Sequence, residues 1–126
     1  MKTIAFATAV LLIGGASAAL AEEPAKTMDT AAGKIYTDSM GMTLYTFDKD
    51  SGGMSNCYDK CAVAWPPFVA AADAKAEGEW TLVERKDGSK MWAYEGKPLY
   101  TFVDDKKAGD VTGDGKGGVW HVAKSD

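Results

Sequence analysis

The sequence has few of the residues that usually build catalytic sites. It contains one histidine and two cysteines in 126 residues, and no serine lies in a nucleophile motif. The acidic residues form no recognisable catalytic pair, so the sequence predicts a protein that is not an enzyme and indicates no cofactor. So small a number of cysteines predicts one added disulfide bond rather than a disulfide framework.

Basic residues are outnumbered by acidic ones. The chain has 14 lysine and arginine residues against 18 aspartate and glutamate residues, which gives a net charge of −4. Nucleic acids and anionic lipid surfaces are bound by proteins that present a basic face. The composition therefore predicts that neither nucleic acid nor an anionic lipid surface is a partner.

No apolar run is long enough to span a bilayer. The run from Ile4 to Ile13 is too short for that, and it lies between Lys2 and an A-x-A-like sequence at residues 19–21. This order predicts a cleaved bacterial signal peptide over residues 1–21 and an exported mature chain without a transmembrane segment, either periplasmic or secreted. No cysteine lies near the cleavage site, so no lipid attachment is expected.

The mature chain is predicted to be one domain preceded by an arm. Its length of about 105 residues can bury a modest core without obligatory crosslinks. Residues 22–32 show no clean apolar period, so we expect them to form a flexible arm. Residues 33–126 then make up the single domain.

An internal duplication occupies this domain. The sequence Leu-Tyr-Thr-Phe at residues 44–47 recurs at 99–102, and the match extends in both directions at one constant offset. The other matched pairs are Gly33 with Gly88, Gly41 with Gly96, Asp50 with Asp105, Asp59 with Asp114 and Trp65 with Trp120. Chance would rarely align so many residues, so the sequence predicts two repeats, at about 33–78 and 79–124.

Short alternating segments between turn residues predict strands in both repeats. These segments are residues 34–37, 43–47, 80–85, 90–94, 98–102 and 119–123. The first two are expected to pair around the turn at 38–41, and the Asp-Gly turn at 87–88 is the strongest hairpin signal. In the segment 43–47, one face is expected to be buried, because two large aromatic residues share it.

One short helix is expected among these strands. Ser55 or Asn56 is predicted to cap it, and it would run over residues 57–64 until two prolines end it. The expected fold is mainly β: a small pseudo-twofold antiparallel β-domain of two hairpin repeats with one short helix. Neither half is expected to be stable alone, because a single hairpin buries too little surface.

Both repeats contain a Y-x-F-x-x-D motif. Its residues are Tyr45, Phe47, Asp50, Tyr100, Phe102 and Asp105. Together with the cysteines and the sequences Trp-Pro-Pro at 65–67, Trp-Ala-Tyr at 92–94 and Trp-His-Val at 120–122, it gives a resemblance over roughly residues 33–124. The chain resembles the bacterial family of secreted repeats of unknown function, also described as predicted lipoproteins. The resemblance implies an exported protein of unassigned activity, although the lipobox cysteine of many members is missing.

We interpret the motif as structural. Tyrosine and phenylalanine two residues apart pack one face of the sheet. Asp50 and Asp105 are expected to accept backbone N–H bonds in the turns that follow them. The motif occurs twice, whereas an active site is usually built once, which favours this interpretation.

The two cysteines allow two interpretations. On a helix, Cys57 and Cys61 lie one turn apart with Cα atoms about 6 Å from each other, which a disulfide bond accepts. Alternatively, Cys57, Cys61 and His121 could bind copper or another metal, with thioethers of nearby methionines as further ligands for Cu(I). These methionines are Met40, Met42 and Met54.

Two weaker patterns point to other ligands. Residues 110–115 place oxygen-bearing side chains like an EF-hand calcium loop, but His121 takes the place of the final glutamate. The four tryptophans and five tyrosines could line a groove for a sugar, a peptide or a cell-wall component. The sequence thus predicts an exported, non-enzymatic β-repeat protein that acts as a binding or structural module, with metal binding as the alternative.

Overall fold

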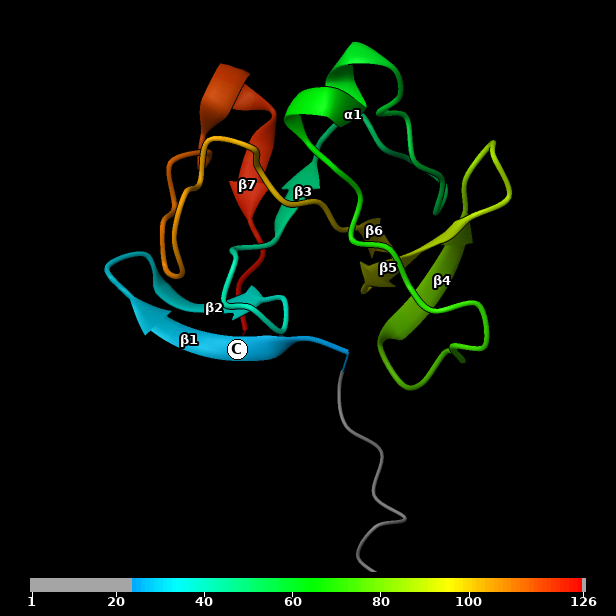
Figure 1. The fold of residues 1–126 in the computed structure, drawn as a ribbon, viewed down its shortest axis with the longest axis horizontal. Helices are drawn as coiled ribbons and strands as arrows, with labels where there is room; N and C mark the ends of the chain where they lie inside the picture. The colour runs from blue at the N-terminus through cyan, green and yellow to red at the C-terminus, as the bar shows by residue number, and fades with distance from the viewer. Residues whose placement is uncertain (1–23, 126) are drawn as a thin grey trace, which may run out of the picture.

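The computed structural model describes residues 24–125 (Figure 1). Within them the chain forms short strands, one short α-helix and one 3-10 helix. In chain order they are β1 (Lys26–Thr30), β2 (Gly33–Thr37), β3 (Tyr45–Phe47), α1 (Lys60–Ala64), β4 (Trp80–Glu84), β5 (Lys90–Tyr94), β6 (Lys97–Pro98), η2 (Lys116–Gly118) and β7 (Trp120–Val122). All strand pairs are antiparallel, which confirms the mainly β class. The predicted signal peptide, residues 1–21, lies outside the described residues.

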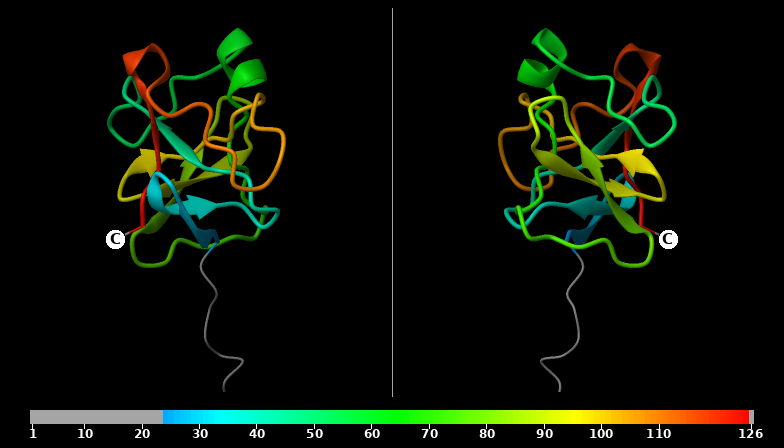
Figure 2. Two further views of the ribbon diagram at one scale, coloured as in Figure 1. Left: turned by 90° about the vertical axis from the view of Figure 1, so that its left-hand side faces the viewer. Right: turned by 90° about the vertical axis from the view of Figure 1, so that its right-hand side faces the viewer.

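The strands form three small sheets, with the orders β1-β2, β3-β7 and β4-β5-β6. The β4–β5 hairpin confirms the strongest turn signal of the sequence, and Gly88 in its turn has φ +89°. In both Figure 1 and Figure 2, α1 and η2 lie together at the end of the molecule opposite the β1–β2 sheet. These two helices occupy equivalent places in the two repeats. In residues 24–125 no helix is long and apolar enough to cross a membrane.

The predicted flexible arm at residues 22–32 is corrected by the structure. Lys26–Thr30 is strand β1, which pairs with β2 and sets Met28 opposite Ile35. The turn is closed by Thr30, whose Oγ1 donates to the carbonyl of Gly33. The side chains of β1 are exposed or only half-buried, so its sequence need not alternate between apolar and polar residues. This exposure explains why the sequence pattern failed to indicate it.

The first predicted hairpin is present only at its turn. The Thr37–Thr43 bridge and the bond from the Leu44 N–H to the Tyr36 carbonyl join its two arms. Beyond Leu44, strand β3 leaves β2 and pairs with β7 instead. The hairpin of the first repeat is therefore β1–β2, in the place that β4–β5 takes in the second.

The helix is shorter than predicted. It begins at Lys60 and not at Cys57, and Asp59 precedes it with φ 56° and no capping side chain. Ser55 and Asn56, the predicted caps, have other partners: the hydroxyl of Ser55 contacts Tyr100, and the amide side chain of Asn56 donates to a backbone carbonyl. The chain before Lys60 is thus held by side-chain contacts that exclude a longer helix.

Two apolar clusters meet the chain segment 43–47, which contains β3, from different sides. Tyr45 belongs to the larger cluster, which includes Trp65 and Trp120, and Leu44 belongs to a second cluster around Trp80. Tyr45 and Leu44 are both fully buried. The expectation of one buried face is therefore incomplete, because this segment is covered on both sides.

Candidate functional site

The motif tyrosines donate hydrogen bonds across the two repeats. The hydroxyl of Tyr45 donates to Asp105 Oδ2, and the hydroxyl of Tyr100 donates to Asp50 Oδ2, both at 2.7 Å. The second oxygen of each aspartate accepts a backbone N–H: Asp50 from Asn56 at 2.7 Å and Asp105 from Thr112 at 2.9 Å. The expected role of the aspartates in their turns is confirmed. Each motif tyrosine pairs with the aspartate of the other repeat, which the sequence pattern did not indicate.

The two motif segments also meet through their backbones. The N–H of Tyr45 donates to the carbonyl of Tyr100 at 2.7 Å, and the N–H of Tyr100 donates back to Tyr45 at 2.9 Å. Both residues are fully buried. Because the exchange relates equivalent residues, it places the pseudo-twofold axis of the repeats between these two tyrosines.

A stack of four aromatic rings follows the same reciprocity. Phe47 of the first repeat stacks on Trp120 of the second, with ring centroids 4.1 Å apart, and Trp65 stacks on Phe102 at 4.0 Å. The two tryptophans stack on each other at 3.8 Å with planes 3° apart. Stacked aromatic pairs add to the stability gained by burial. The aromatic residues of the duplication therefore form the seam between the repeats.

Burial governs the titration of these groups. It raises the pKa of the Tyr45 and Tyr100 phenols well above the ordinary tyrosine value, and the Asp105 and Asp50 carboxylates raise them further. Burial also raises the pKa of Asp50, although hydrogen bonds from Tyr100 and the Asn56 N–H act in the opposite direction. The phenols therefore stay protonated and remain donors at neutral pH.

A buried arginine completes one of the two networks and was not singled out from the sequence. Arg85 is 7% exposed, and its guanidinium donates to Ser55 Oγ and to the carbonyl of Cys57, each at 2.9 Å. Because Tyr100 donates its own proton to Asp50, the Ser55 hydroxyl donates to the Tyr100 oxygen 2.6 Å away. The only sequence signal was the position of Arg85 on the same face of its strand as Val83.

The cysteines form a disulfide bond in the structure. Cys57 and Cys61 are joined with their Cα atoms 5.2 Å apart, as the disulfide interpretation predicted. While this bond is intact, neither residue offers a thiolate to a metal. Within residues 24–125, no three histidine, cysteine, aspartate or glutamate side chains are grouped to hold a metal ion, so His121 does not join the pair.

The calcium-like loop uses its oxygen atoms inside the chain. Asp110 Oδ2 accepts the backbone N–H groups of Lys106 and Lys107, and Asp114 Oδ1 accepts the N–H of Val122 at 3.0 Å. Thr112 donates its hydroxyl to Asp105. These side chains fix the loop to β7 and to the motif network, and they do not converge on a common point for a cation.

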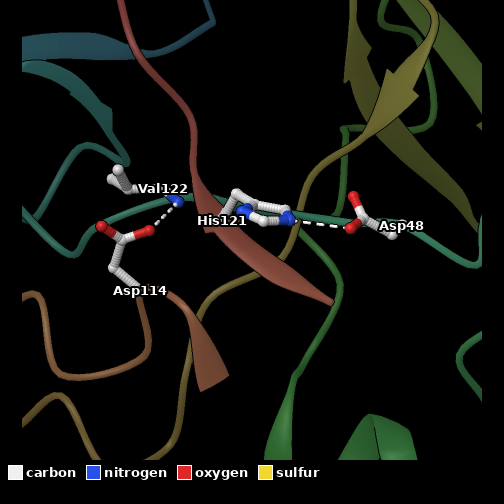
Figure 3. Close-up of polar contacts among 4 residues, drawn as sticks. All are labelled: Asp48, Asp114, His121 and Val122. Atoms are coloured by element: carbon white, nitrogen blue, oxygen red, sulfur yellow. Dashed lines mark hydrogen bonds and ion pairs between the residues drawn. The ribbon is translucent and has the colours of Figure 1, made fainter. Parts of the chain in front are cut away.

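His121 lies at a solvent-facing groove. On β7 the side chains of Trp120 and Val122 point into the core and His121 points outward. His121 Nε2 lies 2.8 Å from Asp48 Oδ2, and the two side chains are 48% and 53% exposed. Figure 3 shows the imidazole between Asp48 and Asp114, with Asp114 turned to the backbone of Val122.

The groove around this pair has a volume of about 200 Å³ and a mixed lining. Its walls come from β3, β7 and the turn between β5 and β6, and its residues are Thr46, Asp48, Tyr94, Glu95, Lys97, Leu99, His121, Val122, Ala123 and Lys124. A second hollow of about 120 Å³ shares Thr46, Asp48 and Lys97 with it. Glu95 has φ 52°, a left-handed backbone conformation that residues other than glycine and asparagine rarely adopt. The arrangement can bind a small ligand through both donors and acceptors.

Comparisons with known proteins identify a family model. A model described as a secreted repeat of unknown function matches residues 26–69 and 81–124. The two segments together cover more than half of the chain, and the first begins at β1. No curated protein and no solved structure matches the chain.

Proposed function

The chain belongs to the family of secreted repeats of unknown function, and on that premise we propose that it is an exported, non-enzymatic binding module of the bacterial envelope. The family description and the Cys57–Cys61 disulfide bond both indicate an exported protein. The proposal assigns the Y-x-F-x-x-D motif to the fold and the groove at His121 to binding.

The observation that carries this proposal is the reciprocal pairing of the motif. Tyr45 donates to Asp105 and Tyr100 donates to Asp50, and both phenols are buried. Their pKa values are raised, so the phenols are weak acids that keep their protons at neutral pH. Groups held in this way stabilise the fold and do not meet a substrate.

The groove supports the binding part of the proposal. It brings Asp48, His121, Glu95 and Lys97 to one surface, which Tyr94 also lines. A few convergent polar groups next to an aromatic ring are typical of small-ligand sites. The half-exposed His121–Asp48 pair adds little stability on the surface, so its position is not explained by folding.

The test is co-sedimentation of the purified mature protein with envelope fractions of the producing bacterium, including purified peptidoglycan sacculi. We expect the protein to pellet with one fraction and to release no soluble fragments from it. The variant H121A/K97A should pellet about tenfold less, because it loses the hydrogen bonds of one imidazole and one ammonium group, whereas K60A on α1 should pellet like the wild type. Release of fragments, or equal pelleting of both variants, would contradict the proposal.

A further inference from the structure

We propose that the groove at His121 binds a neutral saccharide and that its two hollows accept two successive sugar rings. This inference rests on the proposed binding function and names the class of ligand at the same site. It follows from the charged residues that line the groove, the free hydrogen-bonding atoms at its centre, the aromatic ring of Tyr94 and the two adjoining hollows.

The larger hollow is lined by equal numbers of acidic and basic residues, and the smaller hollow adds Asp50. The acidic residues Asp48 and Glu95 line the larger hollow together with the basic residues Lys97 and Lys124. A strongly anionic ligand would meet the two carboxylates, and a cationic ligand would meet the two lysines. A neutral molecule with many hydroxyl groups can instead donate to the carboxylates and accept from the lysines.

The centre of the groove has unused hydrogen-bonding capacity. Within residues 24–125, the His121–Asp48 contact engages only Nε2 of the imidazole and Oδ2 of the carboxylate. Asp48 Oδ1 and His121 Nδ1 are left for a ligand, and the Thr46 hydroxyl lines the groove beside them. Adjacent sugar hydroxyls present donor and acceptor atoms in pairs, which this set of atoms can match.

The groove also offers an aromatic surface held in a fixed position. Tyr94 lines it, and its ring packs on Tyr36 and Trp80 with centroids 4.9 and 4.7 Å apart. An aromatic ring beside polar groups suits a sugar, whose C–H faces are apolar and whose edges are polar. Glu95 follows Tyr94 directly, has a left-handed backbone conformation and also lines the groove.

Two hollows side by side set the length of the ligand. The hollow of about 200 Å³ and the hollow of about 120 Å³ share Thr46, Asp48 and Lys97. Each is smaller than the roughly 300–1,000 Å³ of a typical drug-sized site. A chain of small rings that passes over Asp48 therefore fits better than one bulky molecule.

The experiment is a titration of the ¹⁵N-labelled protein by NMR with cellobiose and with di-N-acetylchitobiose. Glycerol 3-phosphate and putrescine serve as an anionic and a cationic probe. We expect at least one disaccharide to shift the amide signals of Thr46, Asp48, Lys97 and His121 in a saturable way. The charged probes should cause smaller shifts there.

Variants of groove residues test whether the disaccharide binds in the groove. D48N and H121A should each bind the disaccharide about tenfold more weakly, because D48N replaces a charged acceptor by a neutral amide and H121A removes the imidazole. Both positions are half-exposed, so both variants should keep the amide spectrum of the folded protein, and K60A should bind like the wild type. Tighter binding of a charged probe, shifts outside the groove, or no response to either disaccharide would overturn the inference. If the protein still pellets with envelope fractions through the groove in that case, the proposed function stands and only the ligand class is wrong.

Discussion

Tyr45 and Tyr100 each reach across the pseudo-twofold axis to a carboxylate of the other repeat. Each carboxylate is in turn oriented by a backbone N–H group from the loop that follows it. A buried polar group costs stability unless it has a partner, so the tyrosine and the aspartate of a pair depend on each other. At the scale of single residues, the motif is a pair of structural hydrogen bonds.

Replacing a motif tyrosine by phenylalanine should destabilise the fold. Y45F leaves Asp105 Oδ2 without its donor in a site where Asp105 is only 5% exposed. We expect a loss of about 1–3 kcal/mol in the free energy of unfolding, measured by urea denaturation. Y36F is the matched control: Tyr36 is 5% exposed and packs on rings of the second cluster, so its loss should be much smaller. An equal loss in both variants would show that the hydrogen bond from the Tyr45 hydroxyl to Asp105 adds no stability of its own.

The raised pKa values of the two phenols predict a decline of stability in base. Above the ordinary tyrosine pKa of about 10, the unfolded chain releases these protons while the folded chain keeps them. The folded state then binds more protons than the unfolded state. The two phenols therefore make their full contribution to the free energy of unfolding below that pH, and this contribution falls as the pH rises above it. Urea denaturation at a series of pH values below and above the ordinary tyrosine pKa measures this decline. The variant Y45F/Y100F should show a shallower decline, and a decline as steep as that of the wild type would contradict the assignment.

At the scale of secondary-structure elements, turn chemistry was predictable and exposed strands were not. The Asp87-Gly88 turn and the alternation on both sides of it predicted the β4–β5 hairpin. Strand β1, which corresponds to β4, has no fully buried side chain, so its sequence shows no apolar period that could distinguish it from an arm. The helix was predicted three residues too early, because Ser55 and Asn56 look like caps but bond elsewhere.

The loop before β7 should tolerate no side chain at one glycine. A Cβ atom built at Gly113 would lie 2.6 Å from Trp65 and 3.0 Å from Phe102, inside the ring stack. G113A should therefore lower the free energy of unfolding by about 1–3 kcal/mol or more, as overpacking does, in thermal and urea denaturation. G88A is the control, because it meets no atom within 4 Å and strains only a backbone at φ +89°; it should cost about 1 kcal/mol. A smaller loss in G113A than in G88A would argue against a tight stack.

At the scale of the whole molecule, the duplication was visible in the sequence and the exchange between its halves was not. A constant offset shows that Tyr45 and Tyr100 are equivalent. It does not show whether Tyr45 meets Asp50, which is near in sequence, or Asp105, which is not. The structure shows the second arrangement for the tyrosines, and the same exchange for Phe47 with Trp120. Neither repeat contains the carboxylate to which its own motif tyrosine donates.

The groove at His121 could not be predicted for a related reason. Thr46 and His121 are opposite residues of β3 and β7, while Glu95 and Lys97 lie at the turn between β5 and β6. These segments come from both repeats, and no local pattern indicates that they line one surface. His121 was singled out only because it is the one histidine of the chain, and its partner Asp48 was not.

Double-mutant cycles across the motif measure whether each tyrosine interacts with the aspartate of the other repeat. Y45F and Y100F are each combined with D50N and with D105N, and the free energy of unfolding is measured for all single and double variants. We predict coupling of about 0.5–3 kcal/mol for Tyr45 with Asp105 and for Tyr100 with Asp50. Additive effects are predicted for Tyr45 with Asp50 and for Tyr100 with Asp105. Coupling within a repeat, or in none of the four pairs, would contradict the claim that the motif joins the two repeats.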